Sequence, residues 1–193
     1  MQQDEVIEMC QNSGALLRGH FVLSSGLHSS VYLQCAIALQ SPSVAAKFGS
    51  AIADQFRSQR IETVASPAIG GLIIGYELAR HLNVRFIWTE RENGVMTLRR
   101  GFQVSKGERI LVVEDVITTG GSTRETIDAL TKARATVVAA ASIIDRSDGR
   151  ADVGVPRLSL ATLNVSSVNQ ADCESCRRGD IATKLGSRTA NSK

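Results

Sequence analysis

The sequence has no apolar run that approaches the roughly 20 residues of a membrane-spanning helix, so no membrane partner is expected. Its N-terminus, MQQDEVIEMC, is acidic and contains no apolar signal region. Cysteine is scarce, with four among 193 residues. These absences predict a cytoplasmic protein in which Cys10, Cys35, Cys173 and Cys176 stay reduced.

A strong charge of either sign is also missing. The formal net charge is +3 and the isoelectric point is about 8.8, which is too mild to indicate a nucleic-acid partner. Apolar residues make up 43% and charged residues 21%, as in ordinary soluble globular chains. No internal repeat is present, and the length suits one domain with a sizeable core.

The stretch RILVVEDVITTGGST, residues 109–123, indicates a buried strand that ends in an acidic pair. Its apolar run, Ile110–Val113, is short enough for a parallel strand covered on both faces. Glu114 and Asp115 follow, and open α/β sheets bind ligands beyond the carboxyl ends of their strands. Carboxylates at this place can accept hydrogen bonds from the hydroxyl groups of a ribose.

A loop of hydroxyl and glycine residues follows the acidic pair. Its glycines let backbone N–H groups approach an anion. Ser122-x-x-Glu125 has the spacing of a capping box, which predicts that a helix begins at about Thr123. The helix N-terminus would then hold a phosphate, and the acidic pair beside it suits a sugar phosphate. An ordinary strand-to-helix turn with a capping serine explains Ser122 and the glycines, but not the acidic pair.

This stretch resembles the phosphoribosyl pyrophosphate (PRPP) signature of the type I phosphoribosyltransferases, in which an apolar strand, Glu-Asp, two apolar residues and Thr-Thr-Gly-Gly-Ser follow one another. Other phosphate loops fit worse, because the chain has no G-x-x-x-x-G-K-[ST] and no G-x-G-x-x-G after a first strand. The resemblance implies a set of PRPP-binding residues. They are Glu114, Asp115, Val116, Ile117, Thr118, Thr119, Gly120, Gly121 and Ser122.

The segment from residue 14 to residue 34 is rich in Gly, Ser and His and alternates enough for two short strands around Ser24-Ser25-Gly26. It resembles the N-terminal hood that covers the base in orotate phosphoribosyltransferases. A plain β-hairpin with a serine-rich turn is the alternative. His20 and His28 have no third ligand spaced with them, so no metal site is expected there.

From residue 44 onward, predicted strands alternate with predicted helices. This order predicts an α/β fold, with a mostly parallel twisted sheet flanked by helices on both faces and a small N-terminal hood. We expect a single phosphoribosyltransferase domain over residues 1–193. It divides into a hood segment (1–40), an α/β core (41–165) and a polar C-terminal tail (166–193), whose last residues, SRTANSK, we expect to be disordered.

A tight loop, SPAIGG, joins a predicted strand at residues 63–65 to a predicted helix at residues 72–82. It resembles the pyrophosphate loop of the same family, whose backbone amides face the diphosphate. The residues concerned are Ala68, Ile69, Gly70 and Gly71. A strand–helix connection that needs glycine for close packing explains the same residues.

Residues 89–102, TERENGVMTLRRGF, are polar and basic and show no clear periodicity. The segment is longer than a typical connection, so we expect it to be functional or mobile. Better-known family members carry a lysine in the hood and one in the pyrophosphate loop, where this chain has Ser24 and Gly70. They also carry an R-K-x-x-K-x-H-G run in the mobile loop, which is absent here. The cations left for catalysis are Arg91, Arg99 and Arg100, with Arg91 the first choice.

The motifs GHFVLSSGLHS, SPAIGG, TEREN…LRRGF and VVEDVITTGGS, in this order, resemble a bacterial subgroup of the orotate phosphoribosyltransferases. The resemblance implies that PRPP and orotate give orotidine 5′-monophosphate and pyrophosphate, with Mg²⁺, in de novo pyrimidine (UMP) biosynthesis. It also implies a homodimer in which a mobile loop covers the partner's site. Displacement at the ribose C1′ passes through an oxocarbenium-like state. This chemistry needs Mg²⁺, cationic side chains and a lid, and no nucleophile–base constellation stands out.

By the same resemblance, Thr118 lies between phosphate and base, and Arg146 binds the orotate carboxylate through its planar fork. The alternative for Arg146 is a surface residue that pairs with Asp145 or Asp148. Two alternatives for the whole protein stay open. One is a phosphoribosyltransferase for another base, and the other is a non-catalytic regulator that senses PRPP.

Cys173-x-x-Cys176 has the spacing of half a zinc site. A structural tetrahedral site needs a second pair of ligands, which a dimer mate would have to supply. We therefore expect two reduced surface cysteines in a polar tail, dispensable for activity and for the melting temperature, and we assign no metal ligands.

Overall fold

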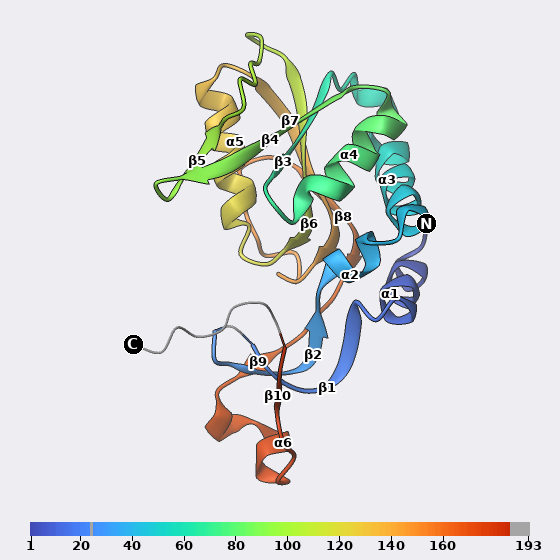
Figure 1. Ribbon diagram of the computed structural model, residues 1–193, viewed down its shortest axis with the longest axis vertical. Coiled ribbons are helices and arrows are strands. Elements are labelled where there is room, and N and C mark those ends of the chain that lie inside the picture. The colour runs from blue at the N-terminus through green and yellow to red at the C-terminus, as the bar shows by residue number, and fades with distance from the viewer. Residues whose placement is uncertain (24, 186–193) are drawn as a thin grey trace.

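The computed structural model describes residues 1–23 and 25–185 and places an α/β core beside a small β-sheet (Figure 1). The core sheet has the strand order β5-β4-β3-β6-β7-β8. Neighbouring strands are parallel except β4 and β5, which are antiparallel. This confirms the predicted α/β fold. The strands are β3 (Thr63–Pro67), β4 (Arg85–Glu92), β5 (Val95–Leu98), β6 (Arg109–Ile117), β7 (Thr136–Asp145) and β8 (Arg157–Thr162).

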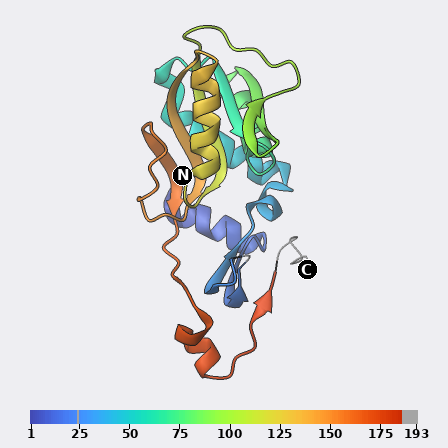
Figure 2. The ribbon, with the colours of Figure 1, turned by 90° about the vertical axis from the view of Figure 1, so that its left-hand side faces the viewer.

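Helices cover both faces of this sheet, as Figure 2 shows. One face carries α1 (Gln3–Asn12), α2 (Cys35–Leu39), α3 (Pro42–Phe56) and α4 (Gly71–Leu82), with a short 3₁₀ turn η1 (Arg57–Gln59) after α3. The other face carries α5 (Gly121–Lys132). None of the helices in the described part of the chain has the length and hydropathy of a membrane span.

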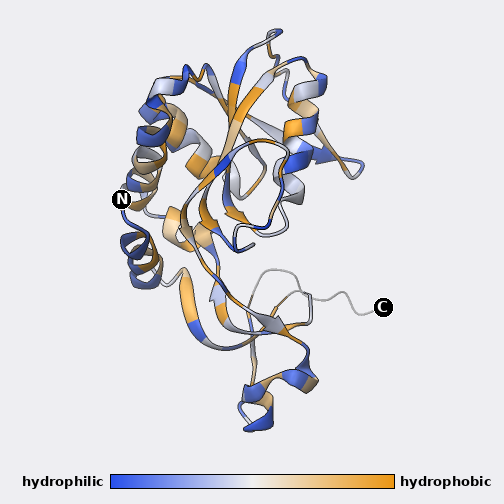
Figure 3. Ribbon diagram, turned by 180° about the vertical axis from the view of Figure 1, so that it is seen from behind, coloured by the Kyte–Doolittle hydropathy of each residue, from blue (hydrophilic) through white to orange (hydrophobic). Residues whose placement is uncertain are grey.

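The central strand β6 explains why its sequence is a continuous apolar run. Side chains alternate along a strand, so Leu111 and Val113 enter the core under α3 and α4, while Ile110 and Val112 enter the core under α5. All four side chains are fully buried. Figure 3 shows the same distribution, with hydrophobic residues along the inner strands and hydrophilic residues on the outer sides of the helices.

The small sheet forms the hood and has the order β10-β1-β2-β9. The hairpin of β1 (Leu16–Val22) and β2 (His28–Leu33) confirms the two predicted strands. The outer strands are β9 (Ser167–Val168) and β10 (Thr183–Lys184), which come from the polar tail. Between them lie a 3₁₀ turn η2 (Gln170–Asp172) and the single turn α6 (Glu174–Arg177). Ser24 and the final SRTANSK lie outside the described residues.

The prediction that residues 89–102 form one long loop was wrong. β4 continues to Glu92 and pairs with β5 as an antiparallel hairpin. Its turn residues, Asn93 and Gly94, have φ values of 51° and 83°, the positive values that a two-residue type I′ turn requires. Asn-Gly is a strong hairpin signal that the sequence analysis missed. The irregular connection is therefore restricted to residues 99–108.

Candidate active site

An open cleft of about 960 Å³ lies between the core and the hood. Its core side includes Thr118, Thr119 and Arg146, which follow β6 and β7. Its hood side includes Tyr32 and Lys184, from β2 and β10. The cleft therefore opens beyond the carboxyl ends of the parallel strands, where the sequence predicted a ligand site.

The acidic pair and the predicted pyrophosphate loop are packed directly against each other. A Cβ built on Gly71 would lie 2.7 Å from Glu114 Oε2, and one built on Gly70 would lie 2.8 Å from Asp115 Oδ1. No L side chain fits at either glycine without moving a carboxyl group. The Ala68–Ile69 peptide bond in this loop is cis. The structure thus joins two motifs that lie more than 40 residues apart in the sequence.

Burial perturbs both carboxyl groups of the acidic pair. Desolvation, together with the nearby charge of Asp115, raises the pKa of Glu114 to about 9, and desolvation also raises the pKa of Asp115. Within residues 1–23 and 25–185, the buried Oε2 atom of Glu114 has no hydrogen-bond partner. Buried polar atoms are normally satisfied, so this oxygen is available to a ligand.

The pKa of Glu114 predicts how stability depends on pH. The folded state holds the Glu114 proton more tightly than the unfolded state, so stability falls as pH rises from about 4.5 to about 9. Glu114→Gln keeps a neutral group at all pH values. Its melting temperature relative to the parent should therefore increase progressively across this range, by roughly 2–4 °C for each kcal/mol of stability that the parent loses.

Thermal unfolding monitored by circular dichroism from pH 5 to pH 9 tests this expectation over the range between the ordinary and the raised pKa. Glu8→Gln, on the exposed side of α1, is the matched control and should remain parallel to the parent. A Glu114→Gln melting temperature that differs from the parent by a constant amount would contradict a raised pKa.

The N-terminus of α5 lies where the sequence predicted a phosphate cradle, but the helix begins differently from the prediction. The helix begins at Gly121 rather than at about Thr123, and its cap is Gly120, with a φ of 77°. The capping box does not form, because Glu125 instead pairs with Arg91 at 2.6 Å. Gly120 has no side chain to cap the helix, and the one side-chain contact to its first N–H groups among the described residues is a long bond of 3.4 Å from the Gly121 N–H to Thr119 Oγ1. Its first N–H groups and positive dipole end consequently face the loop of Thr118 and Thr119.

The remaining predicted PRPP residues belong to β6 itself, since this strand runs past the acidic pair to Ile117. Ile117 is buried, so its side chain supports the core and only its backbone borders the site. The backbone N–H of Arg146 donates to the carbonyl oxygen of Ile117 at 2.7 Å. This bond fixes Arg146 beside Thr118, at the start of the loop.

The guanidinium group of Arg146 has no protein partner among the described residues. Its buried Nε atom lacks a hydrogen bond, and no carboxylate forms an ion pair with it. The alternative pairing with Asp145 does not occur, because Arg157 Nη1 donates to Asp145 Oδ2 at 2.9 Å. Desolvation lowers the pKa of Arg146. An unpaired, partly buried cation that lines a cleft calls for an anionic ligand.

Comparison with known proteins agrees with this geometry. The phosphoribosyl transferase domain family matches residues 38–173. The chain is 50% identical to the orotate phosphoribosyltransferase of Caldicellulosiruptor bescii over 97% of this chain and 99% of that protein. This chain belongs to the orotate phosphoribosyltransferase family.

Two further relatives extend the likeness. The orotate phosphoribosyltransferase of Thermotoga maritima is 49% identical over 94% of this chain and 97% of its own. The crystal structure of orotate phosphoribosyltransferase from Aeropyrum pernix superposes with a TM-score of 0.66 at 32% identity, covering 82% of this chain and 93% of that one. The similarity to orotate phosphoribosyltransferases therefore extends over both the core and the hood.

The three arginines considered for catalysis lie outside the cleft, and each pairs with a carboxylate. Arg91 contacts Glu125 at 2.6 Å, and Arg100 contacts Glu90 at 2.7 Å. Arg99 contacts Glu92 at 3.3 Å and Glu90 at 3.6 Å. All three side chains are substantially exposed. A catalytic role for any of them would require the hairpin, or the connection that follows it, to move or to reach another subunit, and that role stays a prediction.

The sequence analysis missed the cation on the hood side of the cleft. Lys184 lies on β10, opposite Val22 of β1, and lines the cleft. Better-known orotate phosphoribosyltransferases carry a hood lysine where this chain has Ser24. Lys184 supplies an ammonium group to the hood from the other end of the chain. A two-residue strand in a polar tail gave no periodic signal by which to find it.

Proposed function

We propose that this chain transfers the 5-phosphoribosyl group of PRPP to orotate, giving orotidine 5′-monophosphate and pyrophosphate, in de novo pyrimidine biosynthesis. The observation that carries the proposal is the unpaired guanidinium of Arg146 in the cleft, beside Thr118. A planar guanidinium binds a carboxylate through two parallel hydrogen bonds. Orotate carries such a carboxylate, whereas uracil, adenine and hypoxanthine do not.

PRPP fits three neighbouring features of the core. The uncapped N-terminus of α5 suits the 5′-phosphate, and the carboxyl groups of Glu114 and Asp115 suit the ribose hydroxyls. The loop of residues 68–71, packed against the acidic pair, suits the pyrophosphate group. All three lie along the carboxyl ends of β3 and β6, so one extended ligand can reach them together.

Mg²⁺ is part of the proposal, and the residues present fit it. Mg²⁺ prefers oxygen ligands and usually binds through one or two carboxylates and the phosphates of a substrate. Glu114 and Asp115 would hold it, since Oε2 of Glu114 is buried without a partner in the described chain. When bound, the ion neutralises part of the negative charge on the departing pyrophosphate.

The residues of the chain then serve a displacement at C1′ rather than covalent catalysis. The C1′–pyrophosphate bond breaks while the bond to the pyrimidine nitrogen forms, through an oxocarbenium-like state, and the proton lost from that nitrogen leaves with pyrophosphate or passes to water. Arg146 orients the orotate ring from one side, and the core loops hold the ribose phosphate from the other. Holding both reactants in place removes much of the entropic part of the barrier. The hood and a moving hairpin would exclude water.

We further propose a cytoplasmic homodimer with shared active sites. Ile73 and Tyr76 are 45% and 61% exposed and lie three residues apart on α4, and Ile69, which is 83% exposed, lies in the pyrophosphate loop just before this helix. An exposed apolar patch of this kind next to a site favours a protein interface. The free state of the chain's four cysteines supports a reducing compartment.

A base-preference assay tests the proposed reaction. Consumption of orotate is followed spectrophotometrically with PRPP and Mg²⁺, in parallel with adenine, hypoxanthine and uracil. Orotate should be the preferred base, and turnover should stop when Mg²⁺ is chelated. Turnover of a purine without turnover of orotate would indicate a phosphoribosyltransferase for another base. PRPP binding without turnover of any base would indicate a regulator.

A further inference from the structure

Two histidines from the hood meet the two cysteines of the C-terminal segment. His20 Nε2, His28 Nδ1, Cys173 Sγ and Cys176 Sγ all lie within 4.8 Å of one another. His28 and Cys173 are buried, and His20 and Cys176 are partly buried. The sequence analysis rejected a metal here because each pair lacked further ligands. That premise does not hold, because the fold supplies the second pair from the same chain.

We propose that these four side chains form a structural zinc site that fastens the C-terminal segment to the hood hairpin. Two thiolates and two imidazoles form a complete tetrahedral set for Zn²⁺, with no open position for a substrate. The set contains no carboxylate, which distinguishes it from the hard oxygen sites that Mg²⁺ and Ca²⁺ prefer.

The distances match a tetrahedron slightly smaller than one around zinc. Bond lengths of about 2.0–2.1 Å to nitrogen and about 2.3 Å to sulfur imply separations of about 3.3 Å between the nitrogens and about 3.6 Å between nitrogen and sulfur. The two nitrogens lie 2.8 Å apart. The nitrogen–sulfur distances are 3.3 Å and 3.6 Å from His20 and 3.3 Å from His28. Shifts of a few tenths of an ångström would admit the ion.

Hydrogen bonding alone does not explain this cluster. The Nδ1 atom of His20 lies 3.1 Å from the carbonyl oxygen of Asp180 and must donate its proton there, since a carbonyl only accepts. Three atoms, His28 Nδ1 and both sulfurs, then converge on Nε2 of the same ring. A ring nitrogen makes one hydrogen bond along its axis in either protonation state. A cation at the centre satisfies all three contacts at once.

The bond to Asp180 is also the kind of contact that metal-binding histidines make. Such a histidine usually donates its second N–H to a carboxylate or backbone carbonyl, which fixes the ring and its tautomer. Here that carbonyl belongs to the segment that carries both cysteines. Its position is held in turn by a bond from the Asp180 N–H to the carbonyl oxygen of Ser175, at 2.9 Å.

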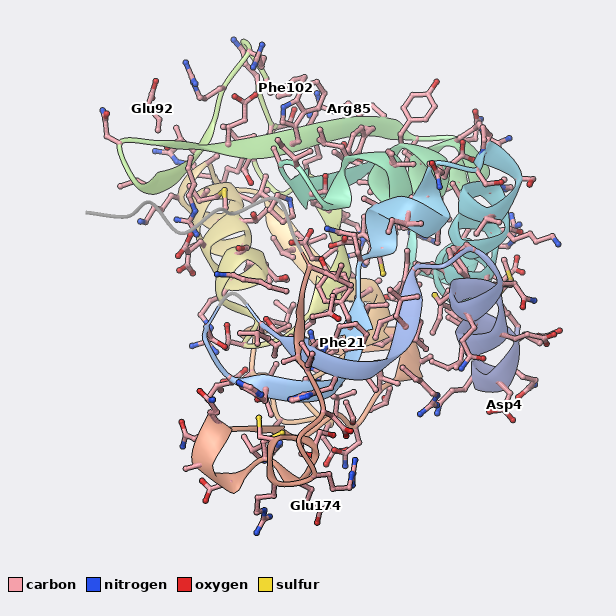
Figure 4. The ribbon with its side chains drawn as sticks, turned by 60° about the horizontal axis from the view of Figure 1, so that its bottom comes forward. Asp4, Phe21, Arg85, Glu92, Phe102 and Glu174 are labelled. Atoms are coloured by element: carbon pink, nitrogen blue, oxygen red, sulfur yellow. The ribbon has the colours of Figure 1, made fainter. Side chains whose placement is uncertain are left out.

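Local structure explains how each pair is formed. In the hairpin, Val22 lies opposite His28, and His20 lies in the irregularity of β1 between Arg18 and Phe21, from which its Nε2 comes within 2.8 Å of His28 Nδ1. Cys173 precedes α6 and Cys176 is its third residue, a spacing that places both sulfurs on one side of a single turn. Figure 4 shows the α6 segment, with Glu174 labelled, next to the hairpin that carries Phe21.

The zinc ion would stabilise β9, β10 and the segment between them, which make few other contacts with the hood. β9 and β10 contribute two residues each to the hood sheet, and few described residues of this segment are buried. The segment nevertheless brings Lys184 to the cleft. If the proposed function is correct, zinc therefore shapes the hood side of the active site without touching substrate.

The first test is the metal content of the native protein, purified without a metal-affinity tag and analysed by mass spectrometry for zinc, iron, cobalt, nickel and copper. About one zinc per chain is expected. Substitution by cobalt should give the intense visible bands of tetrahedral Co²⁺ and a charge-transfer band from sulfur. This spectrum identifies thiolate ligands without any mutation, and so it remains informative if a variant fails to fold.

Variants then assign the ligands. His20→Gln and the double variant Cys173→Ser with Cys176→Ser should lose the zinc and melt at a lower temperature. The matched controls are His81→Gln, on α4, and Cys10→Ala, in the core, and both variants should keep the zinc. Hydrogen exchange after chelation should accelerate in β1, β9 and β10 but not in β6 and β7.

Three results would overturn the proposal. The first is native protein that holds no zinc and takes none up on reconstitution. The second is a Cys173–Cys176 disulfide in place of the zinc site, and the third is full zinc content in the double cysteine variant. Unchanged exchange after complete zinc removal would refute the fastening role. Metal content is measured independently of turnover, so failure of the zinc site leaves the base-preference assay unaffected, and the reverse also holds.

Discussion

Replacing Arg146 by alanine should lower kcat/KM for orotate by roughly 10²-fold or more. Removing one partner of a desolvated, hydrogen-bonded charge pair costs about 2–5 kcal/mol, and each 1.4 kcal/mol is a factor of ten. The low turnover of uracil should barely change, because uracil has no carboxylate to lose. Steady-state kinetics with both bases would therefore show the preference for orotate over uracil disappearing.

The structure provides two controls for this experiment. Arg150→Ala removes a second positive charge that lines the same cleft, but its Nε already donates to the carbonyl oxygen of Ser147. That variant should keep the preference for orotate over uracil. Arg146→Ala should melt no lower than the parent, since no described residue pairs with its guanidinium. Equal losses with orotate and uracil would refute carboxylate recognition by Arg146.

Replacing Arg91 by alanine should lower kcat by roughly 10²–10³-fold, by analogy with loss of an oxyanion donor. The expectation is that Arg91 leaves its ion pair with Glu125 and reaches the pyrophosphate when the hairpin moves. Affinity for orotate should hardly change, because the orotate contact that we propose lies at Arg146. Glu125→Gln is the control. It releases Arg91 from the pair and should not lower kcat.

Mixed dimers test whether the hairpin acts on a partner subunit. Arg91→Ala and Arg146→Ala proteins, each nearly inactive, are mixed under conditions of subunit exchange. If the hairpin crosses, each mixed dimer has one site with both arginines intact, and activity should return. Confirmed exchange without recovery would exclude crossing. Full activity of Arg91→Ala by itself would remove this residue from the mechanism.

Local patterns were sufficient for much of the core. The apolar run Ile110–Val113 predicted the central strand β6. The acidic pair and the glycine loop were found because their residues are consecutive. Where the local prediction failed, a specific competing contact was responsible. Glu125 pairs with Arg91 in place of the capping box, and Asn93-Gly94 closes a hairpin inside the supposed loop.

By itself, then, the sequence determined the α/β fold, the strand–loop–helix of the PRPP signature, the hood hairpin and Arg146 as a candidate. Each depends on side-chain periodicity or on residues adjacent in the chain, which local backbone geometry translates directly into position.

Only the tertiary structure decided which partners these residues have. Gly70 and Gly71 pack against the acidic pair. Asp145 pairs with Arg157, so Arg146 has no carboxylate partner among the described residues. The tertiary structure also brought His20 within reach of Cys173, 153 positions away. Such contacts follow from the packing of whole elements, and short strands such as β10 exist only through their pairing, so no local pattern encodes them.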